Sequence, residues 1–264
     1  MGSGGSEPER NELPAVAAVA LLLVGLLAML GTARLTAPLG LRALFLLSET
    51  ALALPGILTL LARPVPVAVA LGLVPLSRQR AHYALGAGAT LWVASLGLFE
   101  LQAWVWPPDP AYLEAFRRIH DALRPSGPLD ALVSVAAIAL VPALCEETLL
   151  RGILLPSLAR TLGPGAGVLS SAFLFGAIHL DPYRFPFTFA VGIALGILRL
   201  RAGSLLAPVL AHALLNTITF AAAPFAGDPT AETASPLLGT ALLVAGTALS
   251  MAALRSLGTS AEKR

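Results

Sequence analysis

The sequence predicts an all-α membrane protein, a polytopic bundle of about eight transmembrane helices with one amphipathic helix at the membrane surface. Of its 264 residues, 56% are hydrophobic and only 12% are charged. Mean hydropathy is +0.81, and a soluble domain carries about twice this share of charged residues. Several apolar runs approach or exceed the roughly 20 residues that a helix needs to cross a bilayer. Together these observations favour a helical bundle over a barrel.

Eight apolar runs, separated by polar or proline-rich connections, are the predicted spans. They cover residues 13–30, 41–62, 83–102, 129–155, 168–180, 185–200, 205–225 and 237–254. We interpret the first run as a retained anchor rather than a signal peptide, because it is long and has no basic lead. The run 65–76 is too short to cross, so we expect it to lie at the interface or to re-enter the membrane.

Four segments organise the chain. They are a disordered lead (1–12), N-terminal transmembrane helices with an interfacial segment (13–128), a core with the candidate site residues (129–225), and a last span with a basic tail (226–264). In the second segment, apolar and aromatic residues recur at helical spacing over 111–123, which predicts an amphipathic helix on the membrane. This helix either guides a substrate or is a passive surface helix.

The charges are few and unevenly distributed. With eight spans both termini share a side, which carries 10 Lys and Arg residues against 6 on the other side. This bias predicts cytoplasmic termini. The formal net charge is only +2, and no basic patch indicates nucleic acid as a partner.

Two residues within the spans have open interpretations. Glu49 is an acid in the second run, either a helix-packing contact or a partner for Arg151. Cys145 is the single cysteine, which excludes an intrachain disulfide and a multi-cysteine metal site. We interpret it as a small packing residue rather than a nucleophile.

Three ionisable residues, Glu146, Glu147 and Arg151, lie in the middle of the run 129–155. Each such group costs about 2.5–3.5 kcal/mol at membrane depth on insertion scales. Glu147 and Arg151 are four residues apart on one helix face and can neutralise each other. Glu146 points about 100° away, which leaves its carboxylate for chemistry. Pro142, one turn earlier, is expected to kink the helix. The alternative is a buried ion pair that only fixes helix packing.

Two histidines and an asparagine lie in apolar runs downstream. His179 ends the run 168–180, and His212 and Asn216 share one face of a later run. Such a set suits hydrolysis, in which a carboxylate is the base and a histidine–asparagine pair donates to an oxyanion. Two histidines and a carboxylate can equally hold zinc with an open position. The spacing alone leaves both chemistries open.

Three motifs, in this order on successive predicted helices, carry a family resemblance. They are Glu146-Glu147-x-x-x-Arg151, Phe175-x-x-x-His179 and His212-x-x-x-Asn216. The pattern resembles the CPBP family, the CAAX-protease and bacteriocin-processing (abortive-infection) group of intramembrane endopeptidases. The resemblance covers about residues 129–220.

The resemblance implies cleavage of a membrane-anchored protein or peptide, such as a CAAX protein, a bacteriocin precursor or a C-terminal sorting signal. By position, it implies that Glu146 activates the water beside His179. The other implied roles are an oxyanion or ligand face (His212, Asn216) and a supporting pair (Glu147, Arg151). Members are described as metalloproteases and as metal-independent glutamate proteases. We expect no obligatory cofactor, with zinc on His179, His212 and Glu146 as the alternative.

Two other functions remain open at this point. A membrane transporter would show internal repeats with acids in both halves, and none is visible here. A catalytically inactive immunity or scaffold protein of the same fold is less expected, because every motif position is filled. For location, we expect the inner membrane of a prokaryotic cell.

Overall fold

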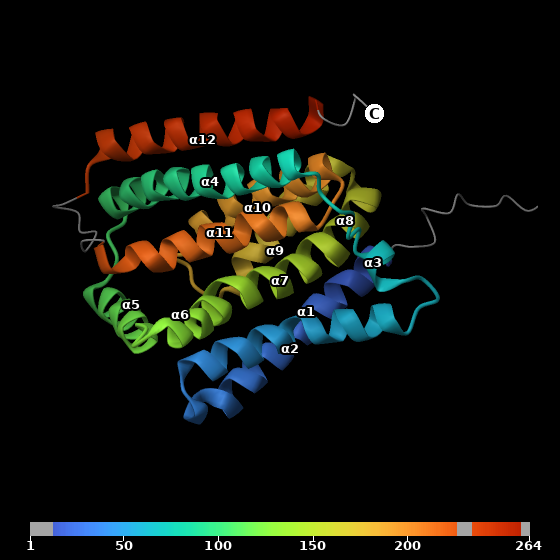
Figure 1. Cartoon of the computed structure of the whole chain (residues 1–264), viewed down its shortest axis with the longest axis horizontal. Coiled ribbons are helices and arrows are strands. Elements are labelled where there is room, and N and C mark those ends of the chain that lie inside the picture. Colours follow the sequence, from blue (N-terminus) through green and yellow to red (C-terminus); the bar gives the residue numbers. More distant parts are fainter. Residues whose placement is uncertain (1–12, 226–233, 260–264) are drawn as a thin grey trace, which may run out of the picture.

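The structure, a computed structural model, describes residues 13–225 and 234–259. Within these two ranges all regular structure is helical and no strand occurs. Most helices run along one common direction as a bundle (Figure 1). Seven of them are long and apolar enough to cross a membrane. The chain is therefore an integral membrane protein, and the predicted polytopic helical bundle is confirmed. The predicted disordered lead, residues 1–12, lies outside the described residues.

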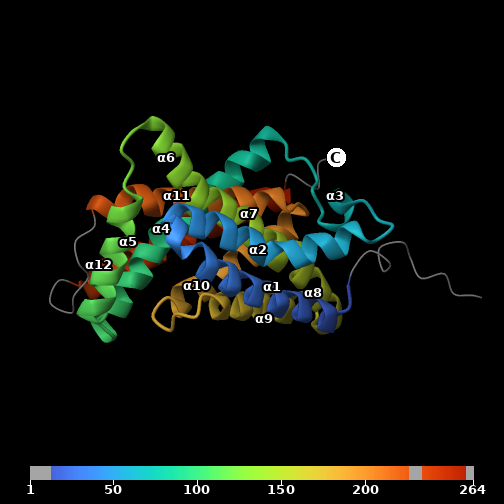
Figure 2. The ribbon, with the colours of Figure 1, turned by 90° about the horizontal axis from the view of Figure 1, so that it is seen from below.

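The α-helices of the described residues follow the chain in the order shown in Figures 1 and 2. They are α1 (Ala15–Thr36), α2 (Leu41–Leu61), α3 (Val67–Ala70), α4 (Arg78–Val105), α5 (Pro110–Leu123), α6 (Pro128–Val135), α7 (Val141–Glu147), α8 (Leu155–Leu162), α9 (Pro164–Ile178), α10 (Phe185–Ala202), α11 (Leu206–Ala222) and α12 (Pro236–Thr259).

One predicted span is shorter than a full crossing. The run 168–180 lies in α9, which has 15 residues. At 1.5 Å per residue such a helix is about 22 Å long, less than the roughly 30 Å hydrocarbon core of a bilayer. The expected count of about eight thus becomes seven long helices and one short apolar helix. α9 packs against α8 and α10, so neighbouring helices cover part of its surface.

The acidic motif lies on the longest helical stretch, Pro128–Leu162, which has 35 residues. Two π-helical stretches, Ala136–Leu140 and Thr148–Leu154, interrupt it. At their ends, the N–H groups of Val141 and Leu155 bond to carbonyl oxygens five residues back. A proline follows each stretch near the start of the next α-helical segment. The irregularity expected near Pro142 is therefore a π-helical stretch, a feature frequent at functional sites.

Two short helices mark opposite ends of the bundle (Figures 1 and 2). α5, the predicted amphipathic helix, lies at what we call the α5 end. There the hydroxyl of Tyr112 donates a 2.9 Å hydrogen bond to Asp181. Burial, and then this bond, raises the pKa of Tyr112, so the hydroxyl stays a donor.

The opposite end, the α3 end, is closed by the short segment between α2 and α4. There the N–H of Leu205 donates to the carbonyl oxygen of Gly72 at 2.9 Å. The hydroxyl of Ser204 donates to the carbonyl oxygen of Val74 at 2.6 Å. The run 65–76 is not among the helices long enough to cross; it packs against the α10–α11 connection instead.

The core of the bundle surrounds the second π-helical stretch, Thr148–Leu154. Every residue of this stretch after Thr148 is buried. On one side lies the α1–α2 hairpin, where a Cβ added at Gly25 would meet the carbonyl oxygen of Leu52. This part of the motif helix therefore lies inside the protein, and the charged group of Arg151 contacts protein rather than lipid.

Candidate active site

A buried ion pair holds the centre of the site. Nη1 of Arg151 lies 2.8 Å from Oε1 of Glu147, and both side chains are fully buried. Nη2 of Arg151 donates to the carbonyl oxygen of Gly192 on α10 at 3.0 Å. The guanidinium group also stacks 4.5 Å from the centre of the Phe175 ring. The pair expected from the four-residue spacing is present, and it ties α7 to α9 and α10.

His212 of α11 lies between the two glutamates. Its Nδ1 is 2.9 Å from Oε1 of Glu147, the same oxygen that accepts from Arg151. Its Nε2 is 3.7 Å from Oε2 of Glu146. Glu147 is thus shared between Arg151 and His212. Sequence spacing did not reveal this link, because it joins residues on two helices.

Glu146 differs from Glu147 in its hydrogen bonding. Its side chain is buried, and its Oε2 atom accepts no hydrogen bond from the described residues. Its electrostatic neighbours include Glu49 of α2 and Arg184, which precedes α10. A buried acceptor of this kind usually has a hydrogen-bonding partner. Oε2 is therefore available to a water or a substrate group.

His179 lies at the end of α9. Its Nδ1 is 2.7 Å from the carbonyl oxygen of Phe175, which leaves Nε2 for other partners. The next residue, Leu180, has φ of +53°, an uncommon backbone conformation for leucine that ends the helix. The Phe175 ring meets the rings of His179 and His212 edge-on, at 5.0 and 5.7 Å between centroids. Phe175 is thus a common neighbour of both histidines.

The remaining polar residues surround this centre less closely. Asn216 is half-buried and lies one turn beyond His212 on α11. Glu49 interacts with Glu146, Cys145 and Arg184, whereas the acids that act on Arg151 are Glu147 and Glu146. Of the two roles considered for Glu49, a partner for Arg151 is not what the structure shows, because Arg151 pairs with Glu147; the helix-packing role stays a prediction. The sequence could point to Glu49, because it is the single acid of the apolar helix α2. No feature of the sequence pointed to Arg184.

The donor set does not form a metal site as it stands. Among the described residues, no three His, Cys, Asp or Glu side chains lie together in a group able to hold a metal ion. His179, His212 and Glu146 were the three candidates. Nδ1 of each histidine is hydrogen-bonded, to Phe175 and to Glu147, which leaves Nε2 of each ring for another partner.

Residues 128–218 match the family model described as type II CAAX prenyl endopeptidase Rce1-like. The chain carries an Rce1-like core. This match confirms the resemblance to the CPBP family. Searches of curated proteins and of solved structures each found no significant match.

The Rce1-like core contains every candidate site residue named from the sequence. They are Glu146, Glu147, Arg151, His179, His212 and Asn216. Glu49 lies outside it, on α2. The family description supports a protease of the CAAX type, an enzyme that acts on a peptide substrate at a membrane.

Proposed function

We propose that this protein is an intramembrane endopeptidase in which Glu146 activates the water that hydrolyses a peptide bond. The observation that carries the proposal is the placement of Glu146 Oε2, which is buried, accepts no hydrogen bond from the described residues and lies 3.7 Å from Nε2 of His212. A carboxylate next to an imidazole in a water-poor setting is a suitable general base.

The proposed reaction moves one proton through Glu146. Its carboxylate takes a proton from water, and the resulting hydroxide attacks the carbonyl carbon of the scissile bond. The carbonyl oxygen becomes an oxyanion. When the tetrahedral intermediate collapses, the C–N bond breaks and Glu146 gives its proton to the leaving amine. General acid–base catalysis of this kind is worth about 10²–10⁴-fold in rate.

His212 and Asn216 are the proposed oxyanion donors. Because Nδ1 of His212 lies 2.9 Å from Glu147, the ring orientation is fixed. In this proposal the ring donates to the oxyanion as an imidazolium, with a proton on Nε2 as well as on Nδ1. The amide of Asn216, one turn further on α11, adds a second donor. His179 is proposed to orient the water. Glu147 and Arg151 support the site, since together they hold His212 and the carbonyl of Gly192.

We propose that no metal is obligatory. The support is that Glu147 is shared by Arg151 and His212, and that no group of three ligands forms among the described residues. If zinc were bound, His179, His212 and Glu146 would have to move together to hold it, and it would supply an activated water. Chelation distinguishes the two chemistries.

We propose a prokaryotic inner membrane as the location, with the α3 end facing the cytoplasm. α1 begins and α12 ends at this end (Figure 1). The Lys and Arg bias of the sequence supports this orientation. In a Cys145→Ala background, a membrane-impermeant maleimide should label Ser126→Cys on intact cells, and Gln79→Cys only after permeabilisation. The reverse pattern would invert the topology.

The function is tested by cleavage in proteoliposomes. Purified protein is mixed with membrane-anchored peptides of three kinds: prenylated CAAX peptides, bacteriocin-like precursors and C-terminal sorting signals. Mass spectrometry then identifies any product. We expect one class to be cut at a single bond, and His212→Gln to abolish the cut. Ion flux without cleavage would favour a transporter, and binding without cleavage an inactive scaffold.

A further inference from the structure

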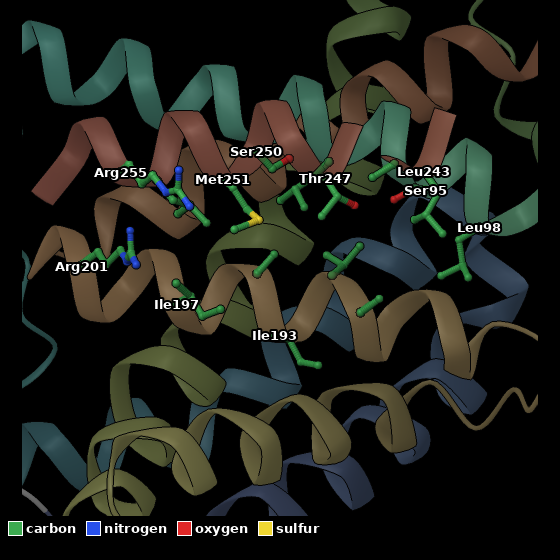
Figure 3. Close-up of a pocket in the computed structure, with 16 residues that line it drawn as sticks. Ser95, Leu98, Ile193, Ile197, Arg201, Leu243, Thr247, Ser250, Met251 and Arg255 are labelled. Carbon is green, nitrogen blue, oxygen red and sulfur yellow. The ribbon is translucent and has the colours of Figure 1, made fainter. Parts of the chain in front are cut away.

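A groove on the outer side of the bundle, away from the candidate site, runs between α10 and α12 over α4. It has a volume of about 420 Å³. Figure 3 shows it as a channel between two facing helices, with side chains of α10 below and α12 above. Ile193 and Ile197 of α10 and Leu243 and Met251 of α12 contribute to its apolar walls.

The groove exists because α12 packs tightly against α4 rather than α10. A Cβ added at Gly246 would meet the backbone of Ala94, and one added at Gly97 would meet the backbone of Leu243. Glycine at both positions lets the two helices approach closely. The space beside α10 therefore stays open, and no described side chain fills it.

One end of the groove is cationic. Arg201, next to the end of α10, and Arg255, in the last turns of α12, line this end (Figure 3). Both are exposed, and neither side chain forms an ion pair with another described residue. Both lie at the α3 end, near Arg199, whose Nη2 reaches the carbonyl oxygen of Leu71 at 3.4 Å. An apolar groove on the outside of the bundle thus ends at two arginines that form no ion pair with a described residue.

The occupant must match both parts of the groove. α4, α10 and α12 are long and apolar enough to cross a membrane, so the groove lies at the depth of lipid chains. An acyl chain fits the apolar walls, and a phosphate at the membrane surface fits two guanidinium groups, which bind phosphate through paired hydrogen bonds. A diacylglycerol or an uncharged prenyl chain would leave both arginines without an anion, and in phosphatidylcholine the choline cation already neutralises the phosphate.

We propose that this groove binds one anionic phospholipid, with its phosphate between Arg201 and Arg255 and one acyl chain between α10 and α12. The hydroxyls of Ser95, Thr247 and Ser250 line the same groove, and that of Ser250 pairs with Thr90 at 2.8 Å. The proposal does not depend on the protease activity. α10 also carries the Gly192 carbonyl that holds Arg151, so the lipid would contact a helix of the candidate site.

The test uses native mass spectrometry of the full chain in detergent, titrated with dioleoyl phosphatidylglycerol or dioleoyl phosphatidylcholine. We expect the first phosphatidylglycerol to bind about tenfold more tightly than phosphatidylcholine. Arg201→Gln and Arg255→Gln should each weaken phosphatidylglycerol binding about fivefold, the effect of one cation near an anionic lipid. Arg201→Lys should keep the preference, which separates loss of charge from loss of fold.

Two controls make the outcome decisive. Arg78→Gln removes an exposed arginine near the α3 end but outside the groove, and it should leave binding unchanged. Thr247→Trp, on an exposed position of α12 that lines the groove, should weaken binding by blocking the acyl chain. Equal affinity for the two lipids, an equal loss in Arg78→Gln, or unchanged binding in Thr247→Trp would each overturn the proposal.

Discussion

Nδ1 of His212 lies 2.9 Å from the Glu147 oxygen that also accepts a 2.8 Å hydrogen bond from Arg151. One buried carboxylate therefore neutralises a cation and orients an imidazole on another helix. Both side chains of the Glu147–Arg151 pair are fully buried. Loss of Glu147 should accordingly affect stability and the geometry of His212 together.

We predict that Glu147→Ala and Arg151→Ala each lower stability strongly. Removal of one partner of a buried ion pair typically costs about 3–5 kcal/mol, because the other charge stays buried without compensation. The measurement is the thermal unfolding midpoint in detergent. Glu114→Ala is the control, since Glu114 and Arg118 form a 2.9 Å pair with the same spacing on the exposed α5. An exposed pair is worth about 0–1 kcal/mol. Equal midpoints for all three variants would contradict a structural role for the buried pair.

Asn216→Ala should lower turnover by about 10²–10³-fold, the usual effect of losing one oxyanion donor. The half-buried position on α11 makes a folding defect small, so kcat should fall with little change in the unfolding midpoint. The control is Thr217→Ala, at the adjacent residue. The hydroxyl of Thr217 donates to the carbonyl oxygen of Ala213 in the same helix at 2.7 Å. This variant should keep near-normal turnover. Retained activity in Asn216→Ala would remove Asn216 from the site.

Much of the fold followed from the apolar runs, because long hydrophobic stretches directly report membrane helices. The run 168–180 was the exception. It lies in a 15-residue helix whose packing against α8 and α10 does not show in hydropathy. The π-helical stretches beside Pro142 and Pro156 were also missed, since proline predicts an irregularity but not its hydrogen-bond pattern.

The site was predictable only where its contacts are local. The Glu147–Arg151 pair lies within one helix, so its spacing predicted it. The bond between Glu147 and His212 joins α7 to α11, and the approach of Glu49 to Glu146 joins α2 to α7. Contacts between helices depend on how the helices pack, which a single sequence does not specify.

Exhaustive chelation should leave proteolysis unchanged, because the proposed reaction uses no metal. Purified active protein should contain far less than one zinc per chain by elemental analysis. The control is a metalloprotease assayed in the same chelator to confirm that metal is removed. Stoichiometric zinc, with activity lost on chelation and restored by zinc alone, would make His179, His212 and Glu146 ligands instead.

The α1–α2 contact gives a test of the fold that is independent of the site. Gly25→Ala should lower the unfolding midpoint, because the added Cβ would overlap the carbonyl oxygen of Leu52. Gly31→Ala, in the same helix, meets no atom within 4 Å. It should be neutral or stabilise by up to about 1 kcal/mol through helix propensity. Equal effects of the two variants would contradict the close packing of the hairpin.

The most direct test of the central claim is the cleavage rate of Glu146→Gln on whichever membrane-anchored peptide the wild-type protein cuts. Glutamine keeps the size of the side chain but cannot take a proton from water, so we predict a loss of about 10²–10⁴-fold with an unchanged unfolding midpoint. Glu100→Gln is the matched control, because Glu100 is a half-buried acid on α4 that binds the N–H of Ser235 at 3.1 Å. It should cleave normally. A Glu146→Gln rate within about threefold of wild type, far above the range for a lost general base, would contradict the account.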